Sequence, residues 1–210
     1  MRLLKLLEDG FAAYGKGDYA AAVSWYRKAA EQGYADAQYI LGGMYNFGRG
    51  VTQDYAAAAS WFRKAADQGN ADAQYILGGM YNFGRGVTHD YAAAVSWFGK
   101  AAEQGNASAQ NNLGVMYDIG RGVTQDYAAA VSWYRKAADQ GDADAQYNLG
   151  GMYDNSQGVP QDYVQAHMWF NLATANGDAD AINNLDSVAA RMTPAQLAEA
   201  KKLAREWKPQ

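Results

Sequence analysis

The sequence predicts an all-α protein, a right-handed superhelical α/α solenoid of stacked helix pairs with a 36-residue period. First, the dipeptide Asp-Tyr recurs at positions 18, 54, 90, 126 and 162, each 36 residues after the last. Second, the unit that starts at Asp18 differs from the unit that starts at Asp54 at only five positions. Third, each unit holds two apolar patterns of helical period and no strand-like alternation. Such a period is typical of repeats that bury their apolar faces only by stacking.

The first helix of each unit is expected at residues 35–47 and at equivalent segments that begin near residues 71, 107 and 143. Its apolar residues fall at i, i+4, i+7 and i+8, which places them on one face of a helix. These residues are Ala37, Leu41, Met44 and Tyr45. Gly48 follows as a stop signal, because glycine readily adopts the left-handed conformation that ends many helices.

The second helix is expected at residues 54–68. Asp54 is a suitable N-cap because its carboxylate can accept the free N–H groups of the first turn. Gly69 supplies the left-handed residue that ends the helix. The residues that share its apolar face are Ala58, Trp61, Phe62 and Ala65.

The loop between the two helices reads GRGV in three of the units. Gly48 and Gly50 are expected to shape a tight loop with Val51 packed beneath it. The segment lacks the G-x-x-x-x-G-K-[ST] pattern and no strand precedes it, so a phosphate-binding role is disfavoured. Hydrogen bonds to loop carbonyls are expected from the recurring arginines, with ligand binding as the less favoured alternative. These are Arg49, Arg85 and Arg121.

The domain organisation is expected to be one solenoid over residues 1–210, with an N-terminal capping helix in 1–17, a repeat array in 18–178 and a C-terminal capping pair in 179–210. The N-terminal helix is expected to be shortened, at about 3–14. The last pair is expected at about 179–192 and 194–208, with Thr193 as N-cap and Pro194 at the first helical position. Its charged outer face suits a terminal cap.

The amino-acid composition limits the classes of function that this chain can have. Hydrophobic residues make up 49% and charged residues 19%, so a packed globular chain is expected. The net charge of −4 gives no electrostatic reason for binding nucleic acid or an anionic membrane. No apolar run reaches the roughly 20 residues of a membrane span. The compartment stays open: a periplasmic or secreted location would need a removed signal peptide, and a cytoplasmic one would not.

Catalytic and metal-binding chemistry has little support. The chain contains no cysteine and only two histidines, with no metal-ligand spacing, so no cofactor or metal is expected. His89 is interpreted as a surface substitution in a loop, and His167 as structural or exposed. Recurring aspartates stand in the first turn of the first helices, where a negative charge suits the helix dipole. They are Asp36, Asp72, Asp144 and Asp180.

Basic pairs recur on the second helices, and a solvated outer face is the expectation for them. Their arginines are placed to reach an acidic residue four positions on. The pairs are Arg27-Lys28, Arg63-Lys64 and Arg135-Lys136.

The motifs resemble the Sel1-like repeat family, a relative of the tetratricopeptide repeats. The pattern A-x3-L-G-x2-Y begins at Ala37, and G-x-G-V-x2-D-x3-A-x2-W-[FY]-x-K-A-A-x2-G runs from Gly48 to Gly69. The loop between the helices is four residues longer than in the 34-residue tetratricopeptide unit, and the turn between repeats is two shorter. The resemblance covers almost the whole chain and implies a helical solenoid. It says less about function, because such repeats serve many roles.

The resemblance also implies where a ligand would bind. In tetratricopeptide arrays the first helix of each pair lines a concave groove, and small glycines at 43, 79 and 151 would leave room for a ligand chain. The alternative is that the tyrosines fill gaps between repeats. Lysines that would clamp a terminal carboxylate are missing, so a basic or neutral extended segment is favoured. The candidate binding residues are Asp36, Tyr39, Asn46, Phe47, Asp72, Tyr75, Asn82, Phe83, Asn111, Asp118, Tyr147 and Asp154.

The resemblance predicts a non-catalytic adaptor or scaffold that binds a protein or peptide along this groove, as family members do in signalling, protein quality control and bacterial envelope or host interaction. One alternative is a β-lactam-binding or β-lactam-hydrolysing relative of cysteine-rich bacterial members, although the cysteines are absent. Another is a purely structural spacer.

The regularity of the repeats fits recent duplication and consensus engineering equally well. The protein is expected to be a monomer, or a weak dimer through an N-terminal apolar patch. This patch comprises Leu3, Leu4, Leu6 and Leu7.

Overall fold

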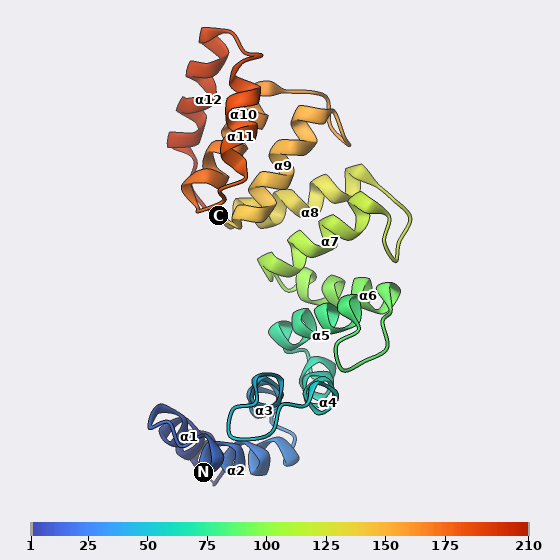
Figure 1. Ribbon diagram of the computed structural model, residues 1–210, viewed down its shortest axis with the longest axis vertical. Helices are drawn as coiled ribbons and strands as arrows, with labels where there is room; N and C mark the ends of the chain where they lie inside the picture. Colours follow the sequence, from blue (N-terminus) through green and yellow to red (C-terminus); the bar gives the residue numbers. More distant parts are fainter. Residues whose placement is uncertain (1, 210) are drawn as a thin grey trace. The chain divides into compact units, whose positions relative to one another are not determined.

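A computed structural model describes the backbone of residues 2–209 and the side chains of residues 4–209, and every regular element in that range is an α-helix (Figure 1). The prediction of an all-α chain of stacked helix pairs is therefore confirmed. The chain divides into two compact units, Met1–Gln104 and Gly105–Gln210.

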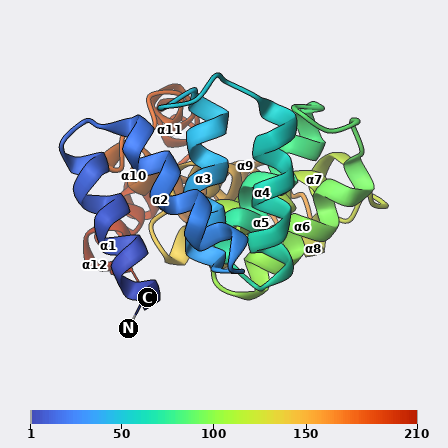
Figure 2. The same ribbon diagram turned by 90° about the horizontal axis from the view of Figure 1, so that it is seen from below.

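Each unit consists of three consecutive helix pairs. Within a pair the helices pack side by side, as Figure 2 shows for α1 with α2 and for α3 with α4. The N-terminal unit comprises α1 (Arg2–Gly15), α2 (Tyr19–Glu31), α3 (Ala35–Phe47), α4 (Tyr55–Asp67), α5 (Ala71–Phe83) and α6 (Tyr91–Glu103). The C-terminal unit comprises α7 (Ala107–Ile119), α8 (Tyr127–Asp139), α9 (Ala143–Asn155), α10 (Tyr163–Ala175), α11 (Ala181–Ala189) and α12 (Pro194–Glu206).

Capping fixes where the helices begin and end. The Asp54 carboxylate accepts hydrogen bonds from the backbone N–H groups of Ala56 and Ala57, each at 2.9 Å, and so starts α4. Gly48 ends α3 in the left-handed region, at φ 67°. Both caps agree with the sequence-based expectation.

The loop after α3 passes close to the preceding pair. A Cβ atom on Gly50 would lie 2.3 Å from the Tyr19 carbonyl oxygen, so only glycine fits there. Val51 packs against the first repeat's core as expected. The loop arginine does not bond a loop carbonyl, because Arg49 donates to the Tyr14 hydroxyl at the end of α1 instead. That contact ties the loop to the previous repeat.

Glycine also sets the close packing within each pair. A Cβ atom on Gly42 would lie 2.9 Å from the ring of Phe62 in α4, and the same arrangement joins Gly78 of α5 to Phe98 of α6. Leu41 is fully buried beside this contact. The small residues of the first helix thus let the aromatic ring of the second approach the backbone.

A buried glutamine joins successive repeats. The Gln38 side-chain amide donates to the Ala30 carbonyl of the preceding second helix at 3.0 Å, and Gln68 donates to Gln38 Oε1 at 2.7 Å. Because both hydrogen-bonding ends are used, the polar side chain can be buried at little cost. The same network recurs around Gln74, with Ala66 and Gln104, and around Gln146, with Ala138 and Asn176.

The arginines of the second helices form a second link between repeats. Arg27 donates to the Tyr45 hydroxyl at 2.7 Å. Arg63 and Arg135 donate to the hydroxyls of the corresponding tyrosines 18 residues on. Each guanidinium reaches forward to the next repeat, where a phenol accepts its hydrogen bond. The expected pairing with the acidic residue four positions on is seen in part, since Arg135 acts to lower the pKa of Asp139, although burial raises that pKa more.

The N-terminal helix differs from its prediction. α1 has 14 residues and is not shortened; what is short is the connection from Gly15 to Tyr19. The four leucines do not form one exposed patch. Leu6 and Leu7 pack against the first repeat's core, Leu4 is exposed, and the side chain of Leu3 lies outside the described residues.

The last two helices of this chain are α11 and α12. Thr193 caps α12 and Pro194 occupies its first turn, as predicted, whereas α11 is shorter than expected and ends at Ala189. α12 packs on α10, and its Trp207 ring meets Trp169 edge-on at 6.4 Å. Because α12 folds back over α10, it covers side chains that solvent would otherwise reach.

His167 lies within α10 and is buried. Burial and the nearby Lys201 lower the pKa of this histidine. Of the two expectations for His167, the structural one is confirmed.

Candidate functional site

The first helices of the N-terminal unit, α1, α3 and α5, carry a matching face whose aromatic rings only partly pack against the second helix of the pair. We call it the first-helix face. It comprises Leu4, Phe11, Asp36, Tyr39, Gly43, Phe47, Asp72, Tyr75, Gly79 and Phe83. In α3 its members stand at i, i+3, i+7 and i+11, which is the spacing of a single helix face. By register, the predicted Asp, Tyr and Phe of α3 share one face of that helix, and those of α5 share the matching face.

Exposed aromatic side chains mark this face. Phe47 is 66% exposed and Phe83 is 77% exposed. Each is the last residue of its helix and precedes a left-handed glycine. The Arg49 guanidinium stands 5.5 Å from the centre of the Phe47 ring. Large side chains exposed at the same position of successive repeats are unusual for a surface that only contacts water.

Two glycines leave the middle of the face open. A Cβ atom on Gly43 or on Gly79 would meet no atom within 4 Å. This contrasts with the neighbouring Gly42 and Gly78, which pack against aromatic rings. The predicted room for a ligand chain beside the helix backbone is thus present.

α1 contributes two residues that sequence reasoning did not place here. Gly10 faces the ring of Tyr26 as Gly42 faces Phe62, so the next residue, Phe11, holds the register of Gly43. Phe11 is 59% exposed. Leu4, which lies two helical turns earlier on the same face of α1, is 69% exposed. An alignment of α1 with the later first helices that allows for the short connection between α1 and α2 would have found both residues from the sequence.

The tyrosines have a partly structural role. Tyr39 and Tyr75 are half-buried, with their rings 5.9 and 6.0 Å from those of Phe62 and Phe98. Burial, with Asp72 of the next repeat as a lesser cause, raises the pKa of Tyr39. These rings therefore pack on the second helix of their own pair.

The first turns of α3 and α5 make one end of this face acidic. α3 and α5 each carry one aspartate in the first turn and no basic residue. Asp36 accepts a 3.4 Å hydrogen bond from Asn70 and stays exposed. The predicted Asn46 and Asn82 are half-buried beside the phenylalanines.

The equivalent residues of the C-terminal unit are largely engaged within that unit. Asn111 is buried and accepts from Asn148 at 3.0 Å, and Tyr147 accepts from Asn184 at 3.1 Å. Asp154 pairs with Arg191 at 2.8 Å.

Asp118 of that unit accepts from the Tyr134 hydroxyl at 3.3 Å. Burial raises the pKa of Asp118 and opposes the lowering effect of this hydrogen bond. These side chains hold successive helices together. The C-terminal unit keeps two open features of the face, because Ile119 at the position of Phe47 is 49% exposed and a Cβ atom on Gly151 would meet nothing within 4 Å. The large exposed aromatic side chains of the face lie in the N-terminal unit.

Other chemistry is sparse in the described part of the chain. No three histidine, aspartate or glutamate side chains gather there as metal ligands. His89 is exposed in its loop, and its ring meets the Tyr91 ring edge-on with 4.0 Å between the ring centres. No helix among residues 2–209 has the length and apolar character needed to cross a bilayer.

Solved structures with this architecture include two bacterial proteins that are 41% identical to this chain. One is a protective antigen of uropathogenic Escherichia coli strains that displays an SLR fold, with a TM-score of 0.80 over 90% of this chain and 41% of that protein. The other is a Sel1 repeat protein from Oxalobacter formigenes, with a TM-score of 0.73 over 81% of this chain and 49% of that protein. The present chain thus spans less than half the length of either relative.

An immunity protein from Pseudomonas aeruginosa is 25% identical, with a TM-score of 0.53 over 94% of this chain and 79% of that protein. No curated protein matches the sequence. The β-lactam and spacer alternatives gain no support from these relatives.

The sequence pattern of the Sel1 repeat matches five consecutive segments: residues 5–34, 35–70, 71–106, 107–142 and 143–178. Repeats of this kind typically mediate protein interactions. Together with the helix pairs and the repeated loop glycines, this match shows that the chain belongs to the Sel1 repeat family.

Proposed function

We propose that this protein is a non-catalytic scaffold that binds an extended segment of a partner protein on the first-helix face of its N-terminal unit. The observation that carries the proposal is the repeated exposure of large apolar side chains, Phe47 and Phe83, beside the open backbone at Gly43 and Gly79. Aromatic side chains next to a backbone that a ligand can approach are favourable features of a peptide-binding surface.

The chemistry of the face defines the partner segment. Apolar side chains of the partner would pack on the phenylalanines and on Phe11 of α1. Asp36 and Asp72, in the first turns of α3 and α5, favour basic over acidic residues in the part of the partner that lies over those turns. The same acidic character disfavours nucleic acid, whose phosphates would be repelled. The partner is therefore an extended peptide with apolar and basic residues.

Selection from a random peptide library on the full chain tests this proposal. The selected peptides should be enriched in apolar and basic residues. Their affinity should fall about tenfold or more for Phe47→Ser/Phe83→Ser, because truncating an aromatic anchor costs on the order of 2 kcal/mol. Phenylalanine is preferred to tyrosine for this test, since Tyr39 and Tyr75 also support the fold.

The matched control replaces exposed side chains on the second helices, Lys64→Ser/Lys100→Ser. The arginines are unsuitable as controls because they bond to tyrosines of the next repeat. Both variants should keep the helical circular dichroism of the parent. Peptides that bind the phenylalanine variant normally but lose affinity for the lysine variant would place the binding surface on the second helices and reject the proposal.

Weak self-association through the N-terminal end is a second part of the proposal. Leu4 is exposed there and offers an apolar side chain to a second copy. Sedimentation over a wide range of concentrations should show a monomer that dimerises weakly, and a mass that stays monomeric throughout would remove this part.

A further inference from the structure

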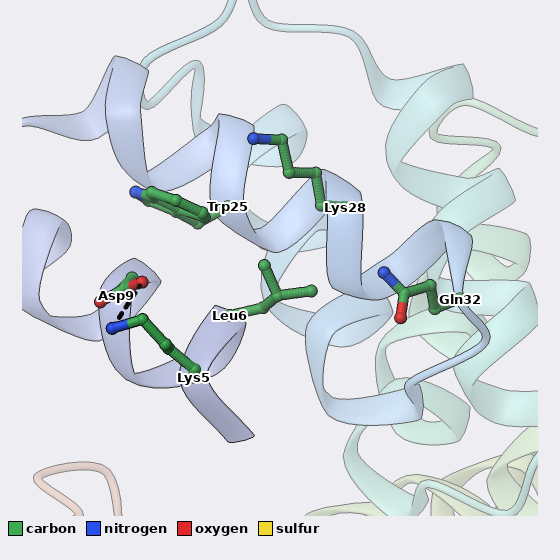
Figure 3. A pocket seen from close by; sticks show the side chains of 6 residues that line it. All are labelled: Lys5, Leu6, Asp9, Trp25, Lys28 and Gln32. Carbon is green, nitrogen blue, oxygen red and sulfur yellow. Dashed lines mark ion pairs between the residues drawn. The ribbon is translucent and has the colours of Figure 1, made fainter. Parts of the chain in front are cut away.

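The sequence contains a single Asn-Gly dipeptide, Asn176-Gly177, which directly follows α10. In the other four Sel1 segments the residue at this position is glutamine, again followed by glycine. These glutamines are Gln32, Gln68, Gln104 and Gln140. Figure 3 shows the first of them, Gln32, where it lines the hollow between α1 and α2. The segment 143–178 therefore differs from the others in having an amide side chain that is shorter by one methylene group.

Asn176 has the same structural role as the glutamines of the earlier repeats. Its side-chain amide donates to Gln146 Oε1 at 2.9 Å, just as Gln68 donates to Gln38 Oε1 in α3. Gln146 is fully buried, and its own amide donates to the Ala138 carbonyl of α8 at 3.2 Å. Asn176 thus holds the end of α10 to α9, and through Gln146 to the preceding repeat.

An asparagine that precedes glycine can react with its own backbone. The peptide nitrogen of Gly177 loses its proton and attacks Cγ of Asn176, so that a new N–Cγ bond closes a five-membered succinimide ring. The Cγ–Nδ2 bond breaks, and the side-chain nitrogen takes up a proton and leaves as ammonia. Water then opens the ring at either carbonyl to give aspartate or isoaspartate, with no oxidation or reduction. Glutamine reacts more slowly, because it has to close a six-membered ring.

The structure leaves this site accessible but holds it closed. Asn176 and Gly177 are both exposed, and a Cβ atom on Gly177 would meet nothing within 4 Å. The Gly177 N–H donates to the Thr174 carbonyl at 3.1 Å, while the Asn176 amide is engaged with Gln146. Both hydrogen bonds have to break before the peptide nitrogen can reach Cγ. Opening of this helix end therefore controls the reaction.

We propose that Asn176 is a site of spontaneous deamidation, that the hydrogen bond to Gln146 controls its rate, and that the reaction loosens the end of α10. After deamidation a carboxylate stands where an N–H donated, and it faces Gln146 Oε1, which is itself an acceptor. Because Gln146 is fully buried, its oxygen is then left without a donor at a cost in free energy. A negative charge at the C-terminal end of α10 also opposes the helix dipole.

Incubation of the full-length chain at mildly alkaline pH, followed by peptide mapping with mass spectrometry, tests the site. Asn176 should lose ammonia faster than any other asparagine and should yield both aspartate and isoaspartate. Asn176→Gln restores the residue of the other repeats and should remove this fast reaction. Faster loss at Asn155, which is exposed at the end of α9 and precedes Ser156, would overturn the assignment.

Gln146→Leu tests the control of the rate, because leucine fills a similar volume and offers no acceptor. The loss of one hydrogen bond should speed deamidation of Asn176 about two- to tenfold. Gln74→Leu removes the equivalent network from the N-terminal unit and should leave this rate unchanged. Circular dichroism has to show that both variants fold. Equal rates in the wild type and in Gln146→Leu would contradict control by this hydrogen bond.

Asn176→Asp reproduces one product and tests the structural consequence. It should unfold at a lower urea concentration than the wild type, whereas Asn176→Gln should unfold at the same concentration as the wild type. Aged wild-type protein should approach the value of Asn176→Asp as the product accumulates. If Asn176→Asp proves as stable as Asn176→Gln, deamidation does not loosen α10 and that part of the inference is wrong. None of these results depends on peptide binding at the first-helix face.

Discussion

Gly78 and Gly79 are neighbours in α5 that differ in what a methyl group would meet. A Cβ atom on Gly78 would lie 2.6 Å from the ring of Phe98, which is itself only 3% exposed and cannot swing away. A Cβ atom on Gly79 would meet nothing within 4 Å. Replacing either glycine by alanine improves helix propensity by about 0.8–1.0 kcal/mol. The two variants therefore share one gain and differ only in the contact.

Gly79→Ala should raise the free energy of unfolding by about 0.8–1.0 kcal/mol. In Gly78→Ala the forced shift of the ring should cost about 1–3 kcal/mol, so this variant should be less stable than Gly79→Ala by that amount. Urea titration followed by circular dichroism measures both, and an unchanged m-value makes the comparison valid. Equal stability of the two variants would mean that Gly78 does not face the second helix and would refute the packing of the pair.

Three further stability predictions can be checked by the same titration. Leu77→Ala should lose about 2–5 kcal/mol because the side chain is fully buried, whereas Leu185→Ala should lose less because it is half-buried. Arg63→Met and Tyr81→Phe each remove the link between repeats and should each cost about 0.5–1.5 kcal/mol, with the double variant losing less than the sum. The pKa of His167 is lowered in the folded state, so the unfolded chain takes up the proton first and stability should fall as the pH drops below 6.5, but not in His167→Gln.

The sequence was a good guide wherever a local signal decides the structure. Asp54 and Gly48 mark the ends of their helices because capping depends on a few neighbouring atoms. The core face of the first helix, including Leu41, follows from the 3.6-residue period alone. Repetition strengthened these signals, since the same caps and faces recur in unit after unit.

Contacts between repeats were harder to foresee because they depend on how far one pair is offset from the next. Nothing local shows that Arg27 reaches the Tyr45 hydroxyl, or that Gln38 is buried between two repeats. A charged residue four positions on was the nearest partner along the helix, but the stacking offset brought a phenol closer. The predicted binding residues also differ by position within the repeat: Phe47 and its equivalent Ile119 are exposed, whereas Asn111, at the position of Tyr39, is buried against Asn148.

Site-specific photo-cross-linking tests the location of peptide binding most directly. A photoreactive phenylalanine analogue at position 47 or 83 would be compared with the same analogue at 64 or 100, on the second helices, using a peptide selected on the wild-type chain. If the peptide binds on the first-helix face, cross-links should form from positions 47 and 83 and not from positions 64 and 100. Cross-links confined to 64 and 100 would contradict it.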